Sequence, residues 1–263
     1  MYPIQIERRV IAPGAAVWRA LSSRTGLALW QADEVRGSVA RGEVVTLAWP
    51  QLGAELHLEV AELVPGRRIT LQDPSSKLIL ELVTGGVRLT HELVIPPDDV
   101  EGMHASWRLA LSQLAHSLER HPGCVRHSEW ASCSLPVSAA QIHSLVTVPE
   151  LAARWLWTGR LGDEGSHAEL TYGGRAVSGR VLCHTPGRDV SVCWEEHGAS
   201  TLTVRTLPSP VSNDERLVAL VWSRWHPVLA DASHIREEGR ALRSELEGSI
   251  TRLTRLVQQT GRA

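Results

Sequence analysis

One order of elements occurs twice in this chain, and the repetition leaves few folds open. Residues 10–30 read VIAPGAAVWRALSSRTGLALW, and residues 134–157 read SLPVSAAQIHSLVTVPELAARWLW. In an ungapped match, Ala15–Leu21 lies over Ala139–Leu145, and Trp155 falls one residue away from the position of Trp30. Both stretches contain a short apolar helix, a break, one further turn and a tryptophan. A repeat of this length predicts two domains of one architecture.

Alternating apolar residues and turn signals predict the elements of the first half. We expect a strand over 4–10, a helix opened by Pro13 and a last short turn ending at Trp30. Strands are then predicted over 43–49, 54–64, 67–72, 77–84 and 86–95, and a long helix over 101–120.

The second half repeats this order after its own paired short helices. Strands are predicted over 167–173, 176–184, 189–195, 200–207 and 216–225, followed by a long helix over 230–258. The sequence HPGCVRHS lies where the copies meet, and its Pro-Gly pair is typical of a connection. We therefore predict a first domain over 1–122, a linker over 123–130 and a second domain over 131–263.

Composition excludes several classes of partner. The chain has 263 residues, 43% of them hydrophobic, a formal net charge of −2 and a pI of about 6.6. The sequence contains no basic block, so neither nucleic acid nor an anionic membrane is expected as a partner. Glu7, Arg8 and Arg9 interrupt the N-terminal residues, which argues against a signal peptide. We expect a cytoplasmic protein.

The cysteines and histidines give no strong metal signature. Cys183 and Cys193 flank a predicted turn, and in a cytoplasmic chain they are expected to be free thiols. His121, Cys124 and His127 follow one another at three-residue intervals, with Cys133 beyond them. This spacing matches no common zinc signature. We therefore predict no metal site and no cofactor.

The order of elements and several short motifs carry a family resemblance. The opening AP..VW.AL, the tryptophan that closes the second short helix, and the motif EGMHASW are similar to the SRPBCC or START-like superfamily, whose fold is the helix-grip fold of the birch-pollen allergen. The chain most resembles bacterial homologues of the C-terminal domain of the heat-shock-chaperone ATPase activator. The second copy is divergent, since LVWSRWHPVLAD precedes its long helix and no G-x-H-x-x-x-W motif is present there.

The resemblance implies an α+β fold with two tandem helix-grip domains. Each would consist of a curved antiparallel β-sheet wrapped around a long C-terminal helix, with two short helices at one end. The family's cavities between sheet and helix take apolar small molecules, and some tandem members are polyketide aromatase/cyclases. The resemblance alone does not transfer any one of these functions.

Strand alternation assigns candidate residues of the first domain to a face. His91 shares a face with Val87, Leu89 and Leu93, so it should point inward, whereas His57 shares a face with two glutamates and should be exposed. A pocket in the first domain would be lined by Trp30, Trp49, His91, His104 and Trp107. The alternative, that each tryptophan simply fills the core, is favoured for any one of them, because large aromatic side chains dominate cores in general.

In the second domain, strand alternation places Tyr172 and Trp194 on inward faces, and Trp155 is the counterpart of Trp30 in the repeat. We predict that these three residues line a ligand-binding cavity. The strand over 216–226 is apolar on both faces, which predicts that its outer face is covered by the other domain or by a second copy of the chain. We therefore expect Trp222 or Trp225 at such an interface.

Three functions fit these features. The first is the binding of an apolar or aromatic small molecule by a carrier or sensor without catalysis. The second is a tandem cyclase/aromatase-like enzyme, in which His91 and His104 would act as an acid/base pair. The third is a protein-interaction module of the co-chaperone type, with collapsed cavities and a protein partner or a homodimer. No P-loop, dinucleotide fingerprint or HExxH motif occurs in the sequence, so no catalytic residue is predicted.

Overall fold

The chain forms two compact units, each with its own core. The computed structural model describes residues 2–94, 97–210 and 212–260. The first unit comprises Met1–Arg126 together with Trp225–Val228, and the second comprises His127–Arg224 together with Leu229–Ala263. The first therefore includes a short segment that follows most of the second in the sequence.

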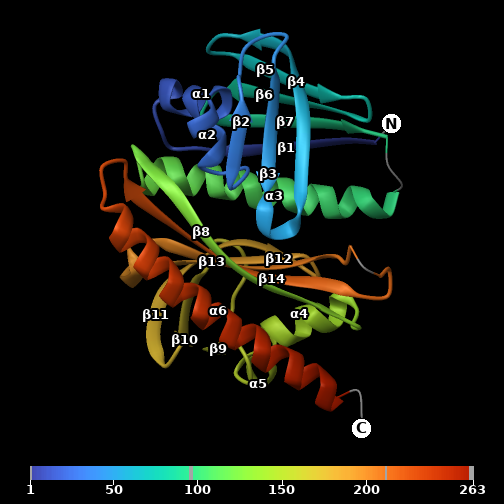
Figure 1. Ribbon diagram of the computed structural model, residues 1–263, viewed down its shortest axis with the longest axis vertical. Helices are drawn as coiled ribbons and strands as arrows, with labels where there is room; N and C mark the ends of the chain where they lie inside the picture. Colours follow the sequence, from blue (N-terminus) through green and yellow to red (C-terminus); the bar gives the residue numbers. More distant parts are fainter. Residues whose placement is uncertain (1, 95–96, 211, 261–263) are drawn as a thin grey trace. The chain divides into compact units, whose positions relative to one another are not determined.

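The first unit consists of a seven-stranded sheet, two short helices and one long helix (Figure 1). Its elements are β1 (Tyr2–Arg9), α1 (Gly14–Ser22), α2 (Arg24–Ala28), β2 (Glu34–Gly37), β3 (Val44–Trp49), η1 (Pro50–Leu52), β4 (Ala54–Val64), β5 (Arg68–Asp73), β6 (Ser76–Val83), β7 (Gly86–Leu93) and α3 (Pro97–Arg120).

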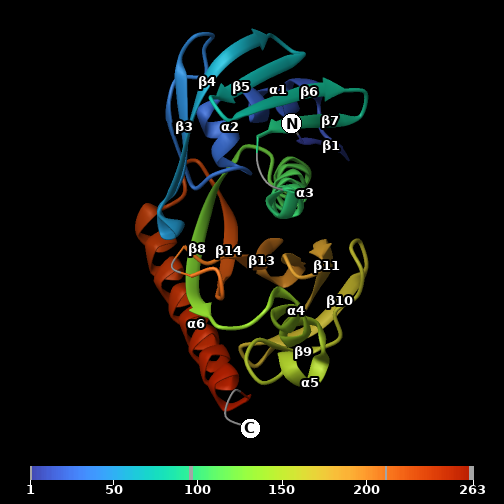
Figure 2. The ribbon, with the colours of Figure 1, turned by 90° about the vertical axis from the view of Figure 1, so that its right-hand side faces the viewer.

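The strand order β1-β7-β6-β5-β4-β3-β2 places the first strand beside the last, and all six pairings are antiparallel. Figure 2 views α3 almost end-on and shows the sheet curving over it. Figure 1 shows α1 and α2 at one end of the sheet. The core between sheet and helix includes Leu47, Leu71 and Leu89 from the strands and Leu111 and Leu114 from α3.

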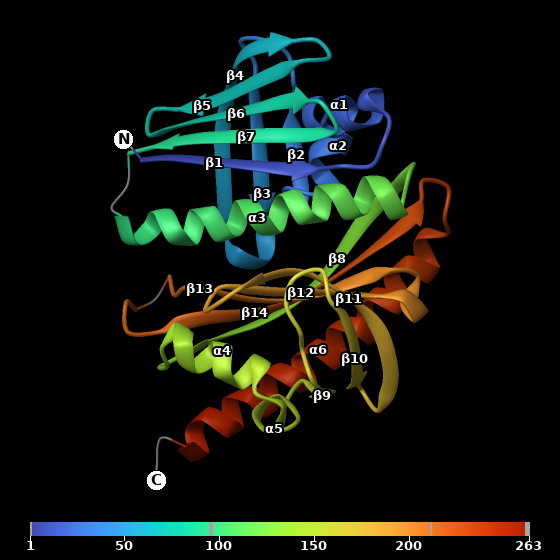
Figure 3. The same cartoon turned by 180° about the vertical axis from the view of Figure 1, so that it is seen from behind.

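The second unit repeats this arrangement (Figure 3). Its elements are β8 (Cys124–Leu135), α4 (Ala139–Thr147), α5 (Pro149–Ala152), β9 (Trp157–Gly159), β10 (His167–Tyr172), β11 (Arg175–Thr185), β12 (Asp189–Trp194), η2 (Glu195–His197), β13 (Ser200–Pro208), β14 (Arg216–Pro227) and α6 (Ala232–Thr260). The strand order β8-β14-β13-β12-β11-β10-β9 is the same permutation as in the first unit. The fold is therefore a tandem helix-grip fold of the α+β class, as predicted.

The two copies of the short helix begin in different ways. Ser138 caps α4 by accepting a hydrogen bond from the backbone N–H of Gln141, whose side chain in turn accepts from the backbone N–H of Ser138. Helix α1 begins after Pro13 and has no side-chain cap. In both helices apolar residues at the spacing of a helical face are buried, including Val17 and Leu21 in α1 and Ile142 and Val146 in α4.

Two sequence predictions about element boundaries are wrong, and two short strands were not predicted at all. Residues 124–135 form strand β8, so the stretch 123–130 is not a free linker. The short strands β2 and β9 were not predicted, because four and three residues are too few to show alternation. Helix α3 begins at Pro97, four residues before the predicted start, because proline is readily accommodated in the first turn of a helix.

Strand β14 is buried on both faces, as its composition predicted. Val218, Leu220 and Trp222 belong to the core of the second unit. Ala219 and Val221, which alternate with them, are also buried. The last residues of the strand, Trp225–Pro227, group with the first unit.

The four cysteines are free, and Cys183 and Cys193 lie on the neighbouring strands β11 and β12. Among the described residues, no group of three or more His, Cys, Asp or Glu side chains could hold a metal ion. None of the described helices is both long enough and apolar enough to cross a membrane.

Candidate functional site

Trp30 and Trp155 occupy equivalent positions, and each donates a hydrogen bond to the short helix that precedes it. The Nε1–H of Trp30 donates to the carbonyl of Ala20 at 3.0 Å, and that of Trp155 donates to the carbonyl of Leu145 at 2.8 Å. In both cases the acceptor lies ten residues earlier, in the first short helix. Trp30 and Trp155 are therefore structural equivalents, although the ungapped alignment of the helices places them one position apart. Both rings are buried and both N–H groups are satisfied, so these side chains anchor the short helices.

A buried polar pair lies inside the first unit. The Nε1–H of Trp107 on α3 donates to Nδ1 of His91 on β7 at 2.8 Å, and the two rings meet edge to face. Both side chains are buried, as strand alternation and the helical stripe predicted. Burial lowers the pKa of His91 to about 4, although the carboxylate of Asp73 opposes this shift.

His91 is therefore neutral at physiological pH, with a defined tautomer. Because Nδ1 accepts the hydrogen bond from Trp107, the ring proton must lie on Nε2. Within the described part of the chain, Nε2 donates to no residue. The first unit thus presents one imidazole N–H donor whose orientation is fixed from behind by a tryptophan.

Two other candidates in the first unit do not lie in its interior. His104 is exposed, so its prediction as a cavity-lining residue is wrong; the buried face of α3 passes through Ala105 and Trp107 instead. Trp49 is half-buried, and its Nε1–H donates to the carbonyl of Gln31 at 3.1 Å. It packs at the edge of the core and connects β3 to the segment that follows α2.

The second unit encloses a cluster of aromatic side chains, which we call the aromatic cluster. Its members are Trp157, Tyr172, Trp194 and Trp222, and each is at most 2% exposed. Trp157 meets Trp194 edge to face with ring centroids 6.3 Å apart, and Tyr172 meets Trp222 in the same way at 5.4 Å. Trp157 and Tyr172 are also register partners on β9 and β10, so the four rings form one connected group.

Some polar groups of the aromatic cluster have a hydrogen-bond partner and others do not. The Nε1–H of Trp222 donates to the Ser200 hydroxyl at 2.9 Å. The Nε1–H of Trp194 and the hydroxyl of Tyr172 are buried and form no hydrogen bond of normal geometry. The Ser249 hydroxyl on α6 lies beside Tyr172 but donates to the carbonyl of Glu245. Burial raises the pKa of Tyr172 to about 12, and Ser249 partly opposes this shift.

Unsatisfied buried polar atoms are uncommon in folded proteins, and each calls for an explanation. A buried N–H without a partner costs about 1–3 kcal/mol relative to its hydrated state. The Nε1–H of Trp194 and the hydroxyl of Tyr172 therefore mark one place in the second unit where a bound hydrogen-bond acceptor would be favourable.

Sequence reasoning missed Trp157, although it is as deeply buried as Trp155. The run Trp-Leu-Trp that ends the repeat contained the only available signal, since two tryptophans separated by one residue share a face of an extended chain. The strand is only three residues long, so alternation could not identify it.

The two predicted interface tryptophans have different environments. Trp222 belongs to the core of the second unit, so its assignment to an interface is wrong. Trp225 groups with the first unit, where its ring stacks on His121 at 4.5 Å and meets His116 edge to face at 5.1 Å. An interface role for Trp225 stays a prediction.

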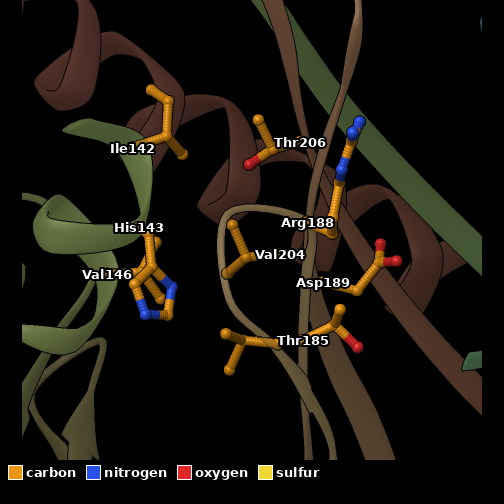
Figure 4. Close-up of a pocket in the computed structure, with 9 residues that line it drawn as sticks. Ile142, His143, Val146, Thr185, Arg188, Asp189, Val204 and Thr206 are labelled. Atoms are coloured by element: carbon orange, nitrogen blue, oxygen red, sulfur yellow. The ribbon is translucent and has the colours of Figure 1, made fainter. Parts of the chain in front are cut away.

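A recess opens between α4 and the strands of the second unit (Figure 4). It encloses about 190 Å³ of empty space, part of which is open to solvent. Within it there is room for about one water molecule. The lining residues combine apolar walls with polar groups: Ile142, His143, Val146, Thr185, Arg188, Asp189, Val190, Val204 and Thr206. None of the predicted site residues lines this recess.

Fold and interior together define a class. The protein has tandem helix-grip units, each with an apolar interior containing a few buried polar groups. No protein-family model matches the sequence, and no curated protein resembles it significantly.

Solved structures with a similar fold match either nearly all of this chain or about half of it. One is the di-domain ARO/CYC BexL from the BE-7585A biosynthetic pathway, with 15% identity, a TM-score of 0.44, and 98% of this chain and 99% of that chain covered. Another is DynU16 from the dynemicin biosynthetic locus, with 17% identity, a TM-score of 0.41, and 97% and 98% covered. A third is the Aha1 dimer from Colwellia psychrerythraea, with 21% identity, a TM-score of 0.41, and 47% and 100% covered.

Proposed function

We propose that this protein binds an apolar, aromatic small molecule that carries a hydrogen-bond-accepting oxygen, and that it acts as a carrier or sensor. The site is the aromatic cluster of the second unit. The observation that carries the proposal is the Nε1–H of Trp194, which is fully buried and has no hydrogen-bond partner. The Tyr172 hydroxyl supplies a second such group in the same cluster.

The chemistry of the cluster selects the class of ligand. Trp157, Trp194 and Trp222 offer large apolar faces and edges suited to a planar ring. An indole N–H can only donate, so the ligand atom that Trp194 recognises must be an acceptor, such as a carbonyl or ether oxygen. Small-molecule sites commonly combine an apolar lining with a few polar groups that fix orientation.

The protonation states favour binding over acid–base catalysis. A general acid or base works best when its pKa lies near the working pH. The pKa of His91 is lowered to about 4 and that of Tyr172 is raised to about 12, so neither group exchanges a proton readily near neutral pH. Both are suited to hold a hydrogen bond of fixed direction. This supports a carrier rather than the cyclase/aromatase-like alternative.

A ligand reaches Trp194 only by displacing side chains that now cover it, because its Nε1 atom has no contact with solvent. We therefore expect slow association, since binding has to follow an opening of the interior. The experiment is a titration of the whole chain with α-tetralone, an aromatic ketone, and with tetralin, the hydrocarbon of the same skeleton. Binding is followed by intrinsic tryptophan fluorescence.

We expect the ketone to bind about tenfold more tightly than the hydrocarbon, which corresponds to one hydrogen bond to a buried donor. In Trp194→Phe this preference should disappear, and in Tyr172→Phe it should decrease. Trp155→Phe is the matched control, because its N–H is already bonded to Leu145 and its loss should leave the preference unchanged. Equal affinities for both molecules in the wild-type protein would refute the proposal.

A further inference from the structure

We propose that Arg252 on α6 determines specificity at the aromatic cluster, because it holds the Ser249 hydroxyl and so leaves the Tyr172 hydroxyl free to bond an oxygen of the ligand. This inference rests on the proposed function and extends it to a side chain outside the cluster. Arg252 is a positioning residue, since it acts on the ligand only through Ser249 and Tyr172.

The spacing of residues along α6 brings a row of polar side chains onto one face of the helix. Ser249 lies four residues after Glu245 and three before Arg252, so these three side chains are neighbours. The adjacent face carries Leu246 and Leu253, which are fully buried in the core of the second unit. The polar row therefore borders the interior that contains the aromatic cluster.

The guanidinium of Arg252 is held by two neutral acceptors. Its Nε–H donates to the carbonyl of Trp155 at 3.1 Å, and its Nη2–H donates to the Ser249 hydroxyl at 2.8 Å. The carboxylate of Glu245 is already occupied, because Nη2 of Arg175 lies 3.0 and 3.2 Å from its two oxygens. Arg252 forms no ion pair with any residue that the structure describes, so these two hydrogen bonds set its position.

The Ser249 hydroxyl is fully buried and already has two partners. Its single proton is donated to the carbonyl of Glu245 at 3.3 Å, and its oxygen accepts from Arg252. Ser249 lies close enough to Tyr172 to affect the pKa of the phenol, yet the two hydroxyls form no hydrogen bond of normal geometry. Because both contacts fix the direction of the Ser249 hydroxyl, it does not turn toward Tyr172.

The loss of Arg252 should release the Ser249 hydroxyl. A rotation about χ1 of Ser249 then lets this hydroxyl bond to that of Tyr172, since a buried polar group without a partner gains free energy from any partner within reach. Tyr172 would be satisfied inside the protein, and the ligand oxygen would lose one of its two partners. Because Trp194 is unaffected, part of the preference for a ketone should remain.

The first test compares the affinities of the whole chain for α-tetralone and tetralin by tryptophan fluorescence. Arg252→Met keeps the aliphatic stem and should reduce the preference for the ketone about threefold, as should Tyr172→Phe. When Arg252→Met is combined with Ser249→Ala, the preference should equal that of the wild type, because no hydroxyl is left to bond Tyr172. Arg255→Met is the charge-matched control at an exposed position of α6 and should change the preference less than about twofold.

The second test needs no ligand, so it separates this inference from the proposed function. In the wild-type background, Tyr172→Phe should raise the ratio of folded to unfolded protein about fivefold, because an unsatisfied buried hydroxyl is removed. In the Arg252→Met background the same change should lower this ratio, because Tyr172 is then bonded to Ser249. Urea unfolding of the four proteins measures the coupling between the two positions.

Three results would overturn the inference. These are an equal effect of Tyr172→Phe on stability in both backgrounds, a wild-type ketone preference in Arg252→Met, and a reduced ketone preference in Ser249→Ala alone. The last result is informative even if Arg252→Met does not fold, since it would show that Tyr172 already depends on Ser249. If the wild type has no ketone preference but the stability effects differ between backgrounds, the proposed function is wrong and the hold of Arg252 on Ser249 is confirmed.

Discussion

At the scale of single residues, the interior depends on which polar atoms have partners. Trp30, Trp107, Trp155 and Trp222 each direct their N–H to a specific acceptor, and these four groups fix the short helices, His91 and Ser200. Trp194 and Tyr172 are buried to the same degree without such an acceptor. Each of these groups raises the free energy of the ligand-free protein because it is buried without a hydrogen bond. A ligand that supplies an acceptor removes this penalty, which favours binding.

The first residue-scale prediction concerns Tyr172→Phe. This change removes a buried hydroxyl that lacks a normal hydrogen bond and keeps the ring, so the free energy of unfolding should rise by about 1 kcal/mol. The control is Trp155→Phe, which loses the bond to Leu145 together with ring volume and should be destabilised by about 2 kcal/mol. Urea unfolding of both variants decides between these outcomes. A Tyr172→Phe protein less stable than the wild type would contradict the account of Tyr172.

A second prediction concerns the loss of stability in acid. The folded protein holds the pKa of His91 near 4, against an ordinary value of 6.5, so between these pH values the unfolded chain binds a proton that the folded chain does not. His91 should therefore reduce stability progressively as pH falls from 6.5 towards 4, by at most about 3 kcal/mol.

In His91→Gln this part of the pH dependence should be absent, as measured by urea unfolding at a series of pH values. His57→Gln is the matched substitution at a histidine that lies exposed on β4. An unchanged curve in His91→Gln would show that other groups cause the acid loss.

The inward-facing positions of some site residues could be predicted from the periodicity of strands and helices alone. Strand period fixed the inward face of His91, and helical period fixed that of Trp107. Their hydrogen bond could not be derived, because it joins a strand and a helix whose relative rotation is set by packing. Trp157 was missed because a three-residue strand shows too little pattern. His104 was misplaced because it lies at the edge of a helical stripe, where one position changes burial entirely.

At the scale of elements, the two copies have the same architecture but begin their first short helix differently. Both first short helices lead to a tryptophan that bonds back ten residues, yet only α4 has a capping box. The sequence permitted both helices to be predicted from Pro13 and from the apolar spacing. It did not reveal β8, because the Pro-Gly pair that suggested a linker ends just before that strand begins at Cys124.

The element-scale prediction concerns Ser138→Ala. Loss of the hydroxyl that accepts from the backbone N–H of Gln141 should lower the free energy of unfolding by about 1 kcal/mol and increase amide exchange in the first turn of α4. Ser144→Ala on the same helix serves as the control, since the Ser144 hydroxyl donates to the carbonyl of Ala140 within the helix and its loss should have little effect. Equal destabilisation by both changes would argue against the cap.

At the scale of the whole molecule, the order of the chain and the two compact units do not coincide. Trp225–Val228 follows most of the second unit in sequence yet groups with the first. The sequence indicated the repeat but could not show this exchange, since the strand over 216–226 is uniformly apolar and carries no boundary signal.

The corresponding prediction concerns Trp225→Ala. Loss of the ring that stacks on His121 and contacts His116 should raise amide exchange at the C-terminal end of α3 about tenfold or more, although these residues lie about a hundred positions away in sequence. Hydrogen exchange followed by mass spectrometry measures this directly. If protection falls only around β14 and α3 is unaffected, Trp225 does not stabilise the first unit.

The most direct test of the proposed function is the indole N–H resonance of Trp194 in a ¹⁵N-labelled protein titrated with α-tetralone. An indole proton that gains a hydrogen bond on binding should move downfield, while the resonance of Trp155 stays in place because its bond to Leu145 is already formed. Tetralin should produce no downfield movement at Trp194. If the ketone saturates the protein and the Trp194 resonance does not move, the aromatic cluster is not the binding site.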